Sequence, residues 1–313
     1  MGETHAGAAN GARCPRVNEE MKPWLGMLGG LVAVLIWSGW IVATRDAMAG
    51  TTDALILALM RNGLPALILM PVWLRRGLIP RGVHLPSILW MTLGWGAPFT
   101  LFVGAGLAHV PAGLFGPLVP GLAPLIVAGL AWAFFANRPG RGVILGLGLM
   151  AIALIAVLSQ WISEGNMAEM QGMPYLLMAS LGISIFTVNM PRSGLNPVEA
   201  TAYICLYSLP IIAVFFLIRP DAFVGETVGS LAWHGLMQGI ITGLGAVLAY
   251  GIAIRHLGAV RGSTANALVP VCAAIAAMAF LGESLTWVDW VAVFCSSLGV
   301  AAVNGAFRKW IGG

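Results

Sequence analysis

Two stretches of the sequence, LVPGLAPLIVAGLAWAFFANRP (118–139) and LVPVCAAIAAMAFLGESL (268–285), share one pattern. Both begin with Leu-Val-Pro, continue through small and apolar residues, and reach an Ala-X-Ala-Phe sequence. The first then ends in Asn-Arg-Pro, whereas the second contains Gly-Glu-Ser near its end. Repetition at this distance suggests that one unit is present twice.

The composition is typical of an integral membrane protein. The chain has 313 residues, of which 59% are hydrophobic and only 9% are charged, and its mean hydropathy is +0.89. Soluble domains carry about 25% charged residues, so this chain has too few to solvate the surface of a globule. The net charge is +4, and the charged residues lie in short connecting segments. This distribution is typical of residues that determine membrane orientation, rather than of a nucleic-acid-binding surface. The four cysteines (Cys14, Cys205, Cys272 and Cys295) have no CxxC spacing, so we expect neither a metal nor a redox site.

Ten apolar runs are each long enough to be a membrane-spanning helix, for which about 20 residues are needed. None alternates as a barrel strand would, so the predicted fold class is all-α, with ten transmembrane helices. The runs are 24–43, 54–73, 87–108, 112–135, 141–158, 174–190, 198–218, 232–255, 263–281 and 287–306. Residues 1–23 form a polar tail without a signal-peptide core, and residues 307–313 form a short basic tail.

Lys and Arg predict the orientation of these runs, because they concentrate on the cytoplasmic side. With the N-terminus inside, 13 of the 16 Lys and Arg residues fall in inside segments and two, Arg45 and Arg219, fall outside. The remaining one, Arg61, lies within a run. Ten spans then place both termini in the cytoplasm.

An offset of 146 residues relates the two halves of the chain. It pairs Pro124 with Pro270, Ser38 with Ser184, and the Ala-X-Ala-Phe of one stretch with that of the other. At an offset of 147, His109 pairs with His256. Each half, 24–158 and 174–306, then holds five spans, and an odd number makes the second half enter the membrane from the opposite side. This predicts an inverted-topology repeat; the alternative is that small, apolar helices match by chance.

The segments HVPAGLFGPLVPGLAPLIVAGLAWAF (109–134) and NALVPVCAAIAAMAFLGESLTWVDW (266–290), with the arginine of LALMRNGLPALIL (57–69), resemble the EamA branch of the drug/metabolite transporter superfamily. The resemblance covers about 24–306. It implies a bacterial inner-membrane carrier with a central cavity, lined mainly by the first, third and fourth helices of each half. The first half departs from the family pattern, because Ala136-Asn137 stands where Gly-Glu is usual, and the glutamate is present only as Glu283. Whether Glu283 does more than terminate its helix stays open.

Arg61 is the strongest candidate for a functional residue. It lies about eight residues into its predicted span, which is roughly 12 Å along a helix at 1.5 Å per residue. A charge at that depth is costly unless it is paired, hydrated or turned towards a cavity. It could hold a substrate carboxylate, or it could be a structural arginine bonded to helix-end carbonyls. His109 and His256 lie at the ends of the third and eighth spans, where they could relay protons or simply sit at the interface.

Further candidates lie inside the predicted spans. Trp95 is flanked by Gly and Pro, which suggests broken backbone of the kind that lines cavities, although packing between helices explains it equally well. Prolines at mid-span free backbone carbonyls or bend the helix, and serines there could join helices. The predicted substrate-binding set is Trp37, Ser38, Arg61, Trp95, Phe99, Pro124, Ser180, Ser184, Asn266 and Pro270.

These features predict a secondary carrier, an exporter by resemblance, of small, partly apolar metabolites such as amino acids. A membrane-embedded enzyme would need a motif such as HExxH, and a pump would need GxxxxGK[ST]; the sequence has neither. A non-transporting receptor or assembly partner is the other alternative, although the short loops offer it little surface. We expect no cofactor, no metal and no nucleic acid, a lipid bilayer and a small-molecule substrate as partners, and a monomer or homodimer.

Overall fold

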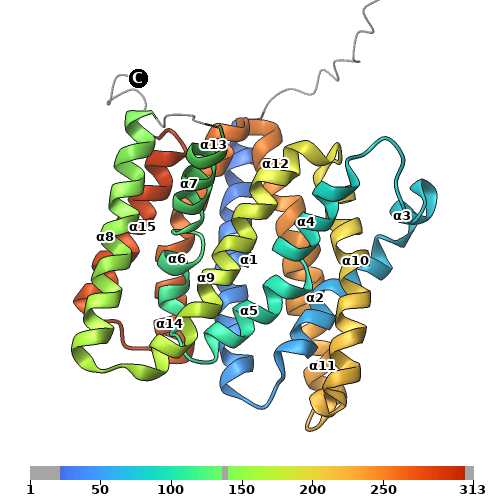
Figure 1. The fold of residues 1–313 in the computed structure, drawn as a ribbon, viewed down its shortest axis with the longest axis horizontal. Helices are drawn as coiled ribbons and strands as arrows, with labels where there is room; N and C mark the ends of the chain where they lie inside the picture. The colour runs from blue at the N-terminus through green and yellow to red at the C-terminus, as the bar shows by residue number, and fades with distance from the viewer. Residues whose placement is uncertain (1–21, 136–139, 307–313) are drawn as a thin grey trace, which may run out of the picture.

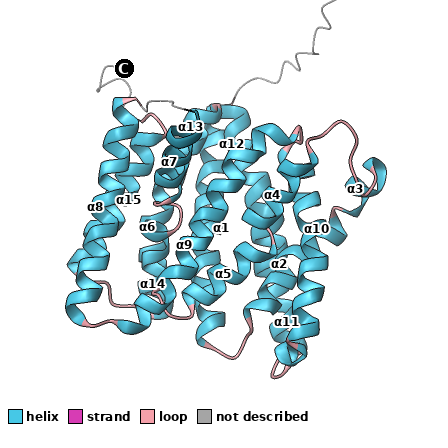
Figure 2. Cartoon of the chain, viewed as in Figure 1, coloured by secondary structure: helices cyan, strands magenta, loops and turns pink. Residues whose placement is uncertain are grey.

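A computed structural model describes residues 22–135 and 140–306. Every regular element in these ranges is a helix (Figure 2), which confirms the predicted all-α class. The predicted tails lie almost entirely outside the described residues, as do Asn137 and Arg138.

The first half contains eight α-helices and one short 3₁₀ turn, and several of the predicted spans are broken in two. The bounds are α1 Pro23–Ala49, α2 Ala54–Ile68, α3 Met70–Arg76, α4 Leu85–Trp95, α5 Ala97–Leu107, η1 Ala112–Leu114, α6 Phe115–Leu118, α7 Ala123–Phe135 and α8 Arg141–Glu164.

The second half begins with two long helices and ends with shorter ones. The bounds are α9 Met167–Ser193, α10 Pro197–Ile218, η2 Pro220–Phe223, α11 Val228–His234, η3 Gly235–Gly245, α12 Ala246–Leu257, α13 Ala259–Thr264, η4 Ala265–Leu268, α14 Val269–Leu281 and α15 Trp287–Val303. The segment η3 is a π-helix, with wider turns than an α-helix.

Each of the ten predicted runs contains helix, but not ten uniform rods. Within the described residues, seven helical segments are long and apolar enough to cross a membrane, α2 and α3 together add a bent candidate, and Ala265–Leu281 and Trp287–Val303 are shorter. The count of ten spans therefore stays a prediction. Some helices extend beyond the predicted runs: α8 continues past 158 to Glu164, and α9 starts before 174, at Met167. Hydropathy locates the apolar part of a helix and not its polar ends.

Prolines explain most of the breaks. A proline has no backbone N–H and fits best in the first turn of a helix. Accordingly, α3, α5 and α14 each begin with a proline at their first or second position. The α2–α3 break bends the chain by 61°, and α3 projects sideways from the bundle in Figure 1.

Helices of the two halves alternate through the bundle rather than forming two separate bodies (Figure 1). The helix α1 packs against α12 and α14, α4 and α5 pack against α9, α2 packs against α10 and η3, and α8 packs against α15. At the α4–α9 crossing the backbones touch: a methyl group added at Gly94 would lie 2.5 Å from the carbonyl oxygen of Gly182. Small residues permit such close crossings in membranes.

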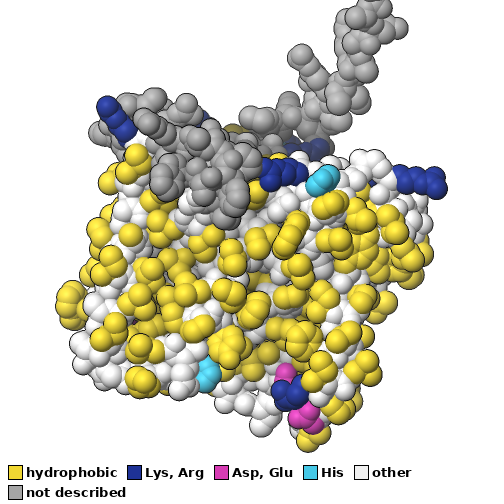
Figure 3. Space-filling view, viewed as in Figure 1, with side chains coloured by type: hydrophobic (Ala, Val, Ile, Leu, Met, Phe, Trp, Pro, Cys, Tyr) yellow, Lys and Arg dark blue, Asp and Glu magenta, His cyan; other side chains and the backbone are white. Residues whose placement is uncertain are grey.

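Charged side chains gather at the two ends of the bundle. On the face in Figure 3, Lys and Arg lie mainly at the end where α1 begins, and Asp and Glu lie at the opposite end. The flanks between them are covered by apolar side chains, as expected for a surface in contact with acyl chains.

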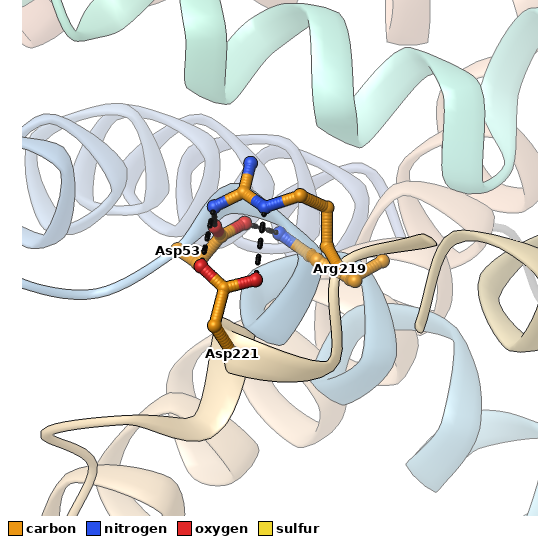
Figure 4. A network of polar contacts seen from close by, with 4 residues as sticks. Asp53, Arg219 and Asp221 are labelled. Carbon is orange, nitrogen blue, oxygen red and sulfur yellow. Dashed lines mark hydrogen bonds and ion pairs between the residues drawn. The ribbon is translucent and has the colours of Figure 1, made fainter. Parts of the chain in front are cut away.

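An ion-pair network joins the halves at the end near α11 (Figure 4). Arg219, after α10, donates to Asp53 and to Asp221, both at 3.1 Å. Asp53 also accepts from the backbone N–H of Leu55 at 2.8 Å and so caps the start of α2. The hydrogen bond from Arg219 lowers the pKa of the Asp221 carboxyl below its usual value.

This lowered pKa gives a pH-dependent prediction. The pairing favours the ionised Asp221, so its contribution to stability is complete above the unfolded pKa, about 3.9, and is lost as pH falls through the lower folded pKa. We expect Asp221→Asn to lower the melting temperature slightly at pH 7, because exposed ion pairs contribute little. The difference in melting temperature between the variant and the wild type should disappear below about pH 4. A difference that stays constant down to pH 3 would contradict this assignment.

Candidate substrate-binding site

Arg61 lies within α2 and is buried, with 6% of its surface exposed. Three aromatic rings surround its guanidinium carbon, at centroid distances of 4.6 Å for Trp40, 5.5 Å for Trp95 and 5.9 Å for Phe99. We call these four residues the arginine box. They come from α1, α2, α4 and α5, so the box lies where four helices of the first half converge.

The break between α4 and α5 builds one wall of the box. The chain turns at Gly96, two residues before Pro98, and this places Trp95 at the end of one helix and Phe99 in the first turn of the next. Their rings stack with centroids 4.6 Å apart, and Trp95 also stacks on Phe186 of α9 at 5.3 Å. The predicted broken backbone around Trp95 is thus present, and it orients two aromatic faces.

The second half contributes a residue that fixes Trp40. Gln238, which is fully buried in η3, accepts a hydrogen bond from Trp40 Nε1 at 2.6 Å. Its Nε2 donates to Thr44 Oγ1 at 3.0 Å. π-Helical segments often occur at functional sites, and this one orients the ring closest to Arg61.

The charge of Arg61 is incompletely satisfied. Within residues 22–135 and 140–306 no ion pair includes Arg61, and its buried Nη1 has no hydrogen-bond partner. An unpaired charge in the bilayer costs about 3 kcal/mol or more, whereas one cation–π contact contributes about 0.5–2 kcal/mol. The rings therefore offset part of the cost and leave a hydrogen-bond donor unused.

The other predicted site residues fall into separate groups. Trp37 lies one turn before Trp40 on α1 and packs edge-on against Tyr250 at 5.3 Å. Asn266 Nδ2 donates to the Tyr250 hydroxyl at 3.4 Å, and Asn266 Oδ1 is buried without a partner. This pair forms a second polar group beside α1, and its role in binding stays a prediction.

The three serines bond to backbone carbonyls of the broken fourth span of each half. Ser38 donates to Val269 at 3.4 Å, Ser180 to Val119 at 2.9 Å, and Ser184 to Ala123 at 3.1 Å. Ser184 Oγ also lies 2.8 Å from the carbonyl oxygen of Ser180 in its own helix, so its single hydroxyl hydrogen is shared between two acceptors. All three hydroxyl hydrogens are thus already used, which favours the packing alternative for these serines.

The two prolines occupy helix starts, because each is the second residue of its helix. Pro124 is partly exposed in α7, whereas Pro270 is buried in α14, where Gly116 of α6 approaches its ring. A proline in the first turn of a helix removes no internal hydrogen bond. Both prolines nevertheless lie within longer apolar helical segments, Ala112–Gly129 and Ala265–Leu281, and whether they bend these segments or free a carbonyl for a ligand stays a prediction.

The two histidines lie at opposite ends of α1 and cannot exchange a proton directly. His256 Nδ1 accepts from the backbone N–H of Lys22 at 3.4 Å, next to the start of α1. His109 follows Leu107 and Ala108, whose carbonyls accept from Arg45 near the other end of α1. About 20 residues of helix, roughly 30 Å, separate these two places.

Glu283 does more than follow its helix, which ends at Gly282 with a φ of 65°. Its carboxylate accepts the backbone N–H groups of Ala112 at 2.9 Å and Gly113 at 3.1 Å, at the start of η1. Arg45 Nε lies 3.5 Å from the same carboxylate. We call this arrangement the glutamate clip; it joins α14 of the second half to α1 and η1 of the first.

Comparison with known proteins agrees with this architecture. Residues 170–305 match the model of the EamA-like transporter family. They form an EamA domain. This domain contains nearly all of α9 and every later described helix, so Gln238 and Glu283 lie within it. The apolar helices indicate a multi-pass membrane protein, and the matched part of the chain is similar to transporters of the EamA-like family.

Solved structures support the fold beyond the EamA domain. One, titled "Crystal structure of protein", is 17% identical and aligns over 91% of this chain and 98% of its own, with a TM-score of 0.56. At this identity the likeness concerns the fold alone. No curated protein matches the chain.

Proposed function

We propose that this protein is a secondary carrier of small, partly apolar metabolites such as amino acids, in which two inverted repeats, 24–158 and 174–306, open the site alternately to each side. The observation that carries this proposal is a matched pair of hydrogen bonds. Ser38 donates to the carbonyl of Val269, and Ser184 donates to that of Ala123. Ser38 and Ser184 lie 146 residues apart, and so do Ala123 and Val269. If each residue is replaced by its counterpart 146 positions away in the other half, the bond from Ser38 to Val269 becomes the bond from Ser184 to Ala123.

The histidine contacts support the same relation. A methyl group at Gly26 would lie 2.9 Å from Cβ of His256, and one at Gly172 would lie 2.9 Å from Cβ of His109. The two glycines are 146 residues apart and the two histidines 147. Each histidine thus packs beside the first helix of the opposite half, which favours a structural role over a proton relay.

Helix packing follows the same exchange. The first span of each half packs against the third span of the other, as α1 does with α12 and as α9 does with α4 and α5. The fifth spans, α8 and α15, pack against each other. In an inverted repeat such near-equivalence gives two conformations of similar energy that face opposite sides of the membrane.

The distribution of charge supports a cytoplasmic location for both termini. Lys and Arg gather where α1 begins (Figure 3), and this is the end that the positive-inside rule places in the cytoplasm. Together with the resemblance to bacterial carriers, this favours the inner membrane and export towards the opposite side.

Flux through purified protein tests the proposal. We expect proteoliposomes loaded with labelled leucine, phenylalanine and other small metabolites to release at least one of them saturably and faster than protein-free liposomes. Trp95→Ala should slow that flux at least tenfold, about 1.4 kcal/mol, because it removes a wall of the box. The matched control is Trp90→Ala, since Trp90 is 51% exposed on the neighbouring helix turn. Absence of flux for every metabolite would refute the carrier assignment and favour a non-transporting component.

A further inference from the structure

The unused hydrogen-bond capacity of Arg61 indicates what the site binds. A guanidinium carries five N–H donors in its plane, whereas cation–π contacts use its faces. Trp40, Trp95 and Phe99 can cover the faces of Arg61, but they offer no acceptor to its edge. The buried Nη1 is a donor on that edge, and it has no partner in the described structure.

We propose that the arginine box binds the carboxylate of a small organic monoanion with an apolar or aromatic body. This inference rests on the carrier function proposed above and names the substrate class of the same site. A carboxylate lies in the guanidinium plane and accepts parallel hydrogen bonds from it. The ligand would thus supply the acceptor that the protein lacks, while the aromatic rings contact its apolar body.

The surroundings of Arg61 favour a single negative charge. Its neighbour Asn62 uses its amide N–H within the helix, donating to the carbonyl of Ala58 at 2.9 Å. Gln238 is occupied by Trp40 and Thr44. The polar side chains around the box therefore leave one cation to be neutralised, and a dianion would bring one charge without a partner into a buried site.

Gln238 is the positioning residue of this site. It holds Trp40 through the indole N–H at 2.6 Å, and Trp40 is the ring closest to the guanidinium, at 4.6 Å. The bond crosses from the second half to the first, so movement of η3 relative to α1 would disturb the box. Gln238 thereby links carboxylate affinity to the arrangement of the two halves.

Binding of matched acids and amides to the full-length protein in lipid nanodiscs tests the proposal. The probes are 3-phenylpropionate, 4-methylpentanoate and benzoate, which are monoanions at pH 7, each compared with its carboxamide, which keeps the shape and removes the negative charge. We expect at least one acid to bind about tenfold or more tightly than its amide, as charge-assisted hydrogen bonds allow. Equal affinity for acid and amide in every pair, or no binding by any acid, would overturn the proposal.

Variants locate the effect. Arg61→Met should abolish the preference for acid, and Arg61→Lys should keep part of it, because it retains the charge without the planar fork. Arg75→Met is the matched control, since Arg75 is exposed at the end of α3. Retention of the full preference for acid by Arg61→Met would contradict the assignment. If Arg61→Met does not fold, the test rests on Arg61→Lys: complete loss of the preference in this variant, with the protein folded, would show that the positive charge does not attract the acid and would also contradict the assignment.

The role of Gln238 has its own readout. Gln238→Met and Trp40→Phe should each lower the affinity for the acid. The double variant should lose no more affinity than the more strongly affected single variant, because both substitutions remove the same hydrogen bond. Additive losses would show that Gln238 does not act through Trp40.

The binding and flux experiments separate the two proposals. Arg61-dependent acid binding without any flux would refute the carrier and keep the carboxylate site. Flux of a metabolite without preference for an acid would keep the carrier and refute the carboxylate site.

Discussion

Replacement of Gly94 by alanine is expected to remove most of the folded protein from the membrane or to lower its stability by about 3 kcal/mol. The added methyl group would lie 2.5 Å from the carbonyl oxygen of Gly182 and 3.2 Å from the backbone nitrogen of Phe186. Both are backbone atoms of α9, so no side-chain rotation relieves the clash, and α4 and α9 would have to separate. The measurement is the amount of monodisperse protein that survives a heating series.

The matched control for this variant is Gly148→Ala. Gly148 lies in the interior of α8, and a methyl group added there meets nothing within 4 Å. Alanine is the better helix former by about 1 kcal/mol, so this control should be neutral or stabilising. If Gly94→Ala has the same melting temperature as Gly148→Ala, the close α4–α9 crossing is wrong.

Replacement of Glu283 by glutamine is expected to destabilise the protein by about 2 kcal/mol, the typical contribution of a hydrogen bond to a charged group. Its carboxylate accepts two backbone N–H groups and lies beside Arg45, whereas a glutamine amide has one acceptor oxygen and no charge. One buried N–H at the start of η1 would lose its partner. The measurement is again the melting temperature of the purified protein.

A double-mutant cycle shows whether the glutamate clip acts as a unit. Arg45→Met and Glu283→Gln should be less than additive, since each disrupts the same arrangement. Glu169→Gln is the control, because Glu169 is a partly exposed acidic residue in the first turn of α9. Wild-type stability of Glu283→Gln would mean that the clip contributes nothing measurable.

The sequence was sufficient for those features that depend on composition and period. Long apolar runs predicted the helices, and the depth of Arg61 in its run marked it as unusual. The offset of 146 residues was visible in Ser38 and Ser184, and it now has a physical counterpart in their two hydrogen bonds. The apolar runs, the depth of Arg61 and the offset are all patterns along the chain, so they can be found without the structure.

The partners of Arg61 could be predicted only in part. Trp95 and Phe99 were included because they lie beside a Gly-Pro break. Trp40 and Gln238 were not, because they lie 198 residues apart and meet only when η3 packs against α1. The remaining signal was a glutamine within an otherwise apolar run, where an unpaired amide would be costly.

The effect of the prolines on their helices and the contacts of Glu283 could not be predicted either, because both depend on tertiary structure. Sequence shows that a proline interrupts hydrogen bonding, but not whether the helix bends or stops and restarts. For Glu283, the two N–H groups that it accepts lie 170 residues or more away in the chain. The counterpart position in the first half, Asn137, lies outside the described residues.

Counterflow in proteoliposomes tests the central claim most directly, because transient uphill accumulation of label requires a carrier that alternates with one site. Vesicles are loaded with an unlabelled acid that binds the protein and are diluted into a trace of the labelled acid. We predict transient accumulation with the wild type and with Arg75→Met, and none with Arg61→Met. Absence of counterflow in the wild type, or undiminished counterflow in Arg61→Met, would contradict alternating transport through the arginine box.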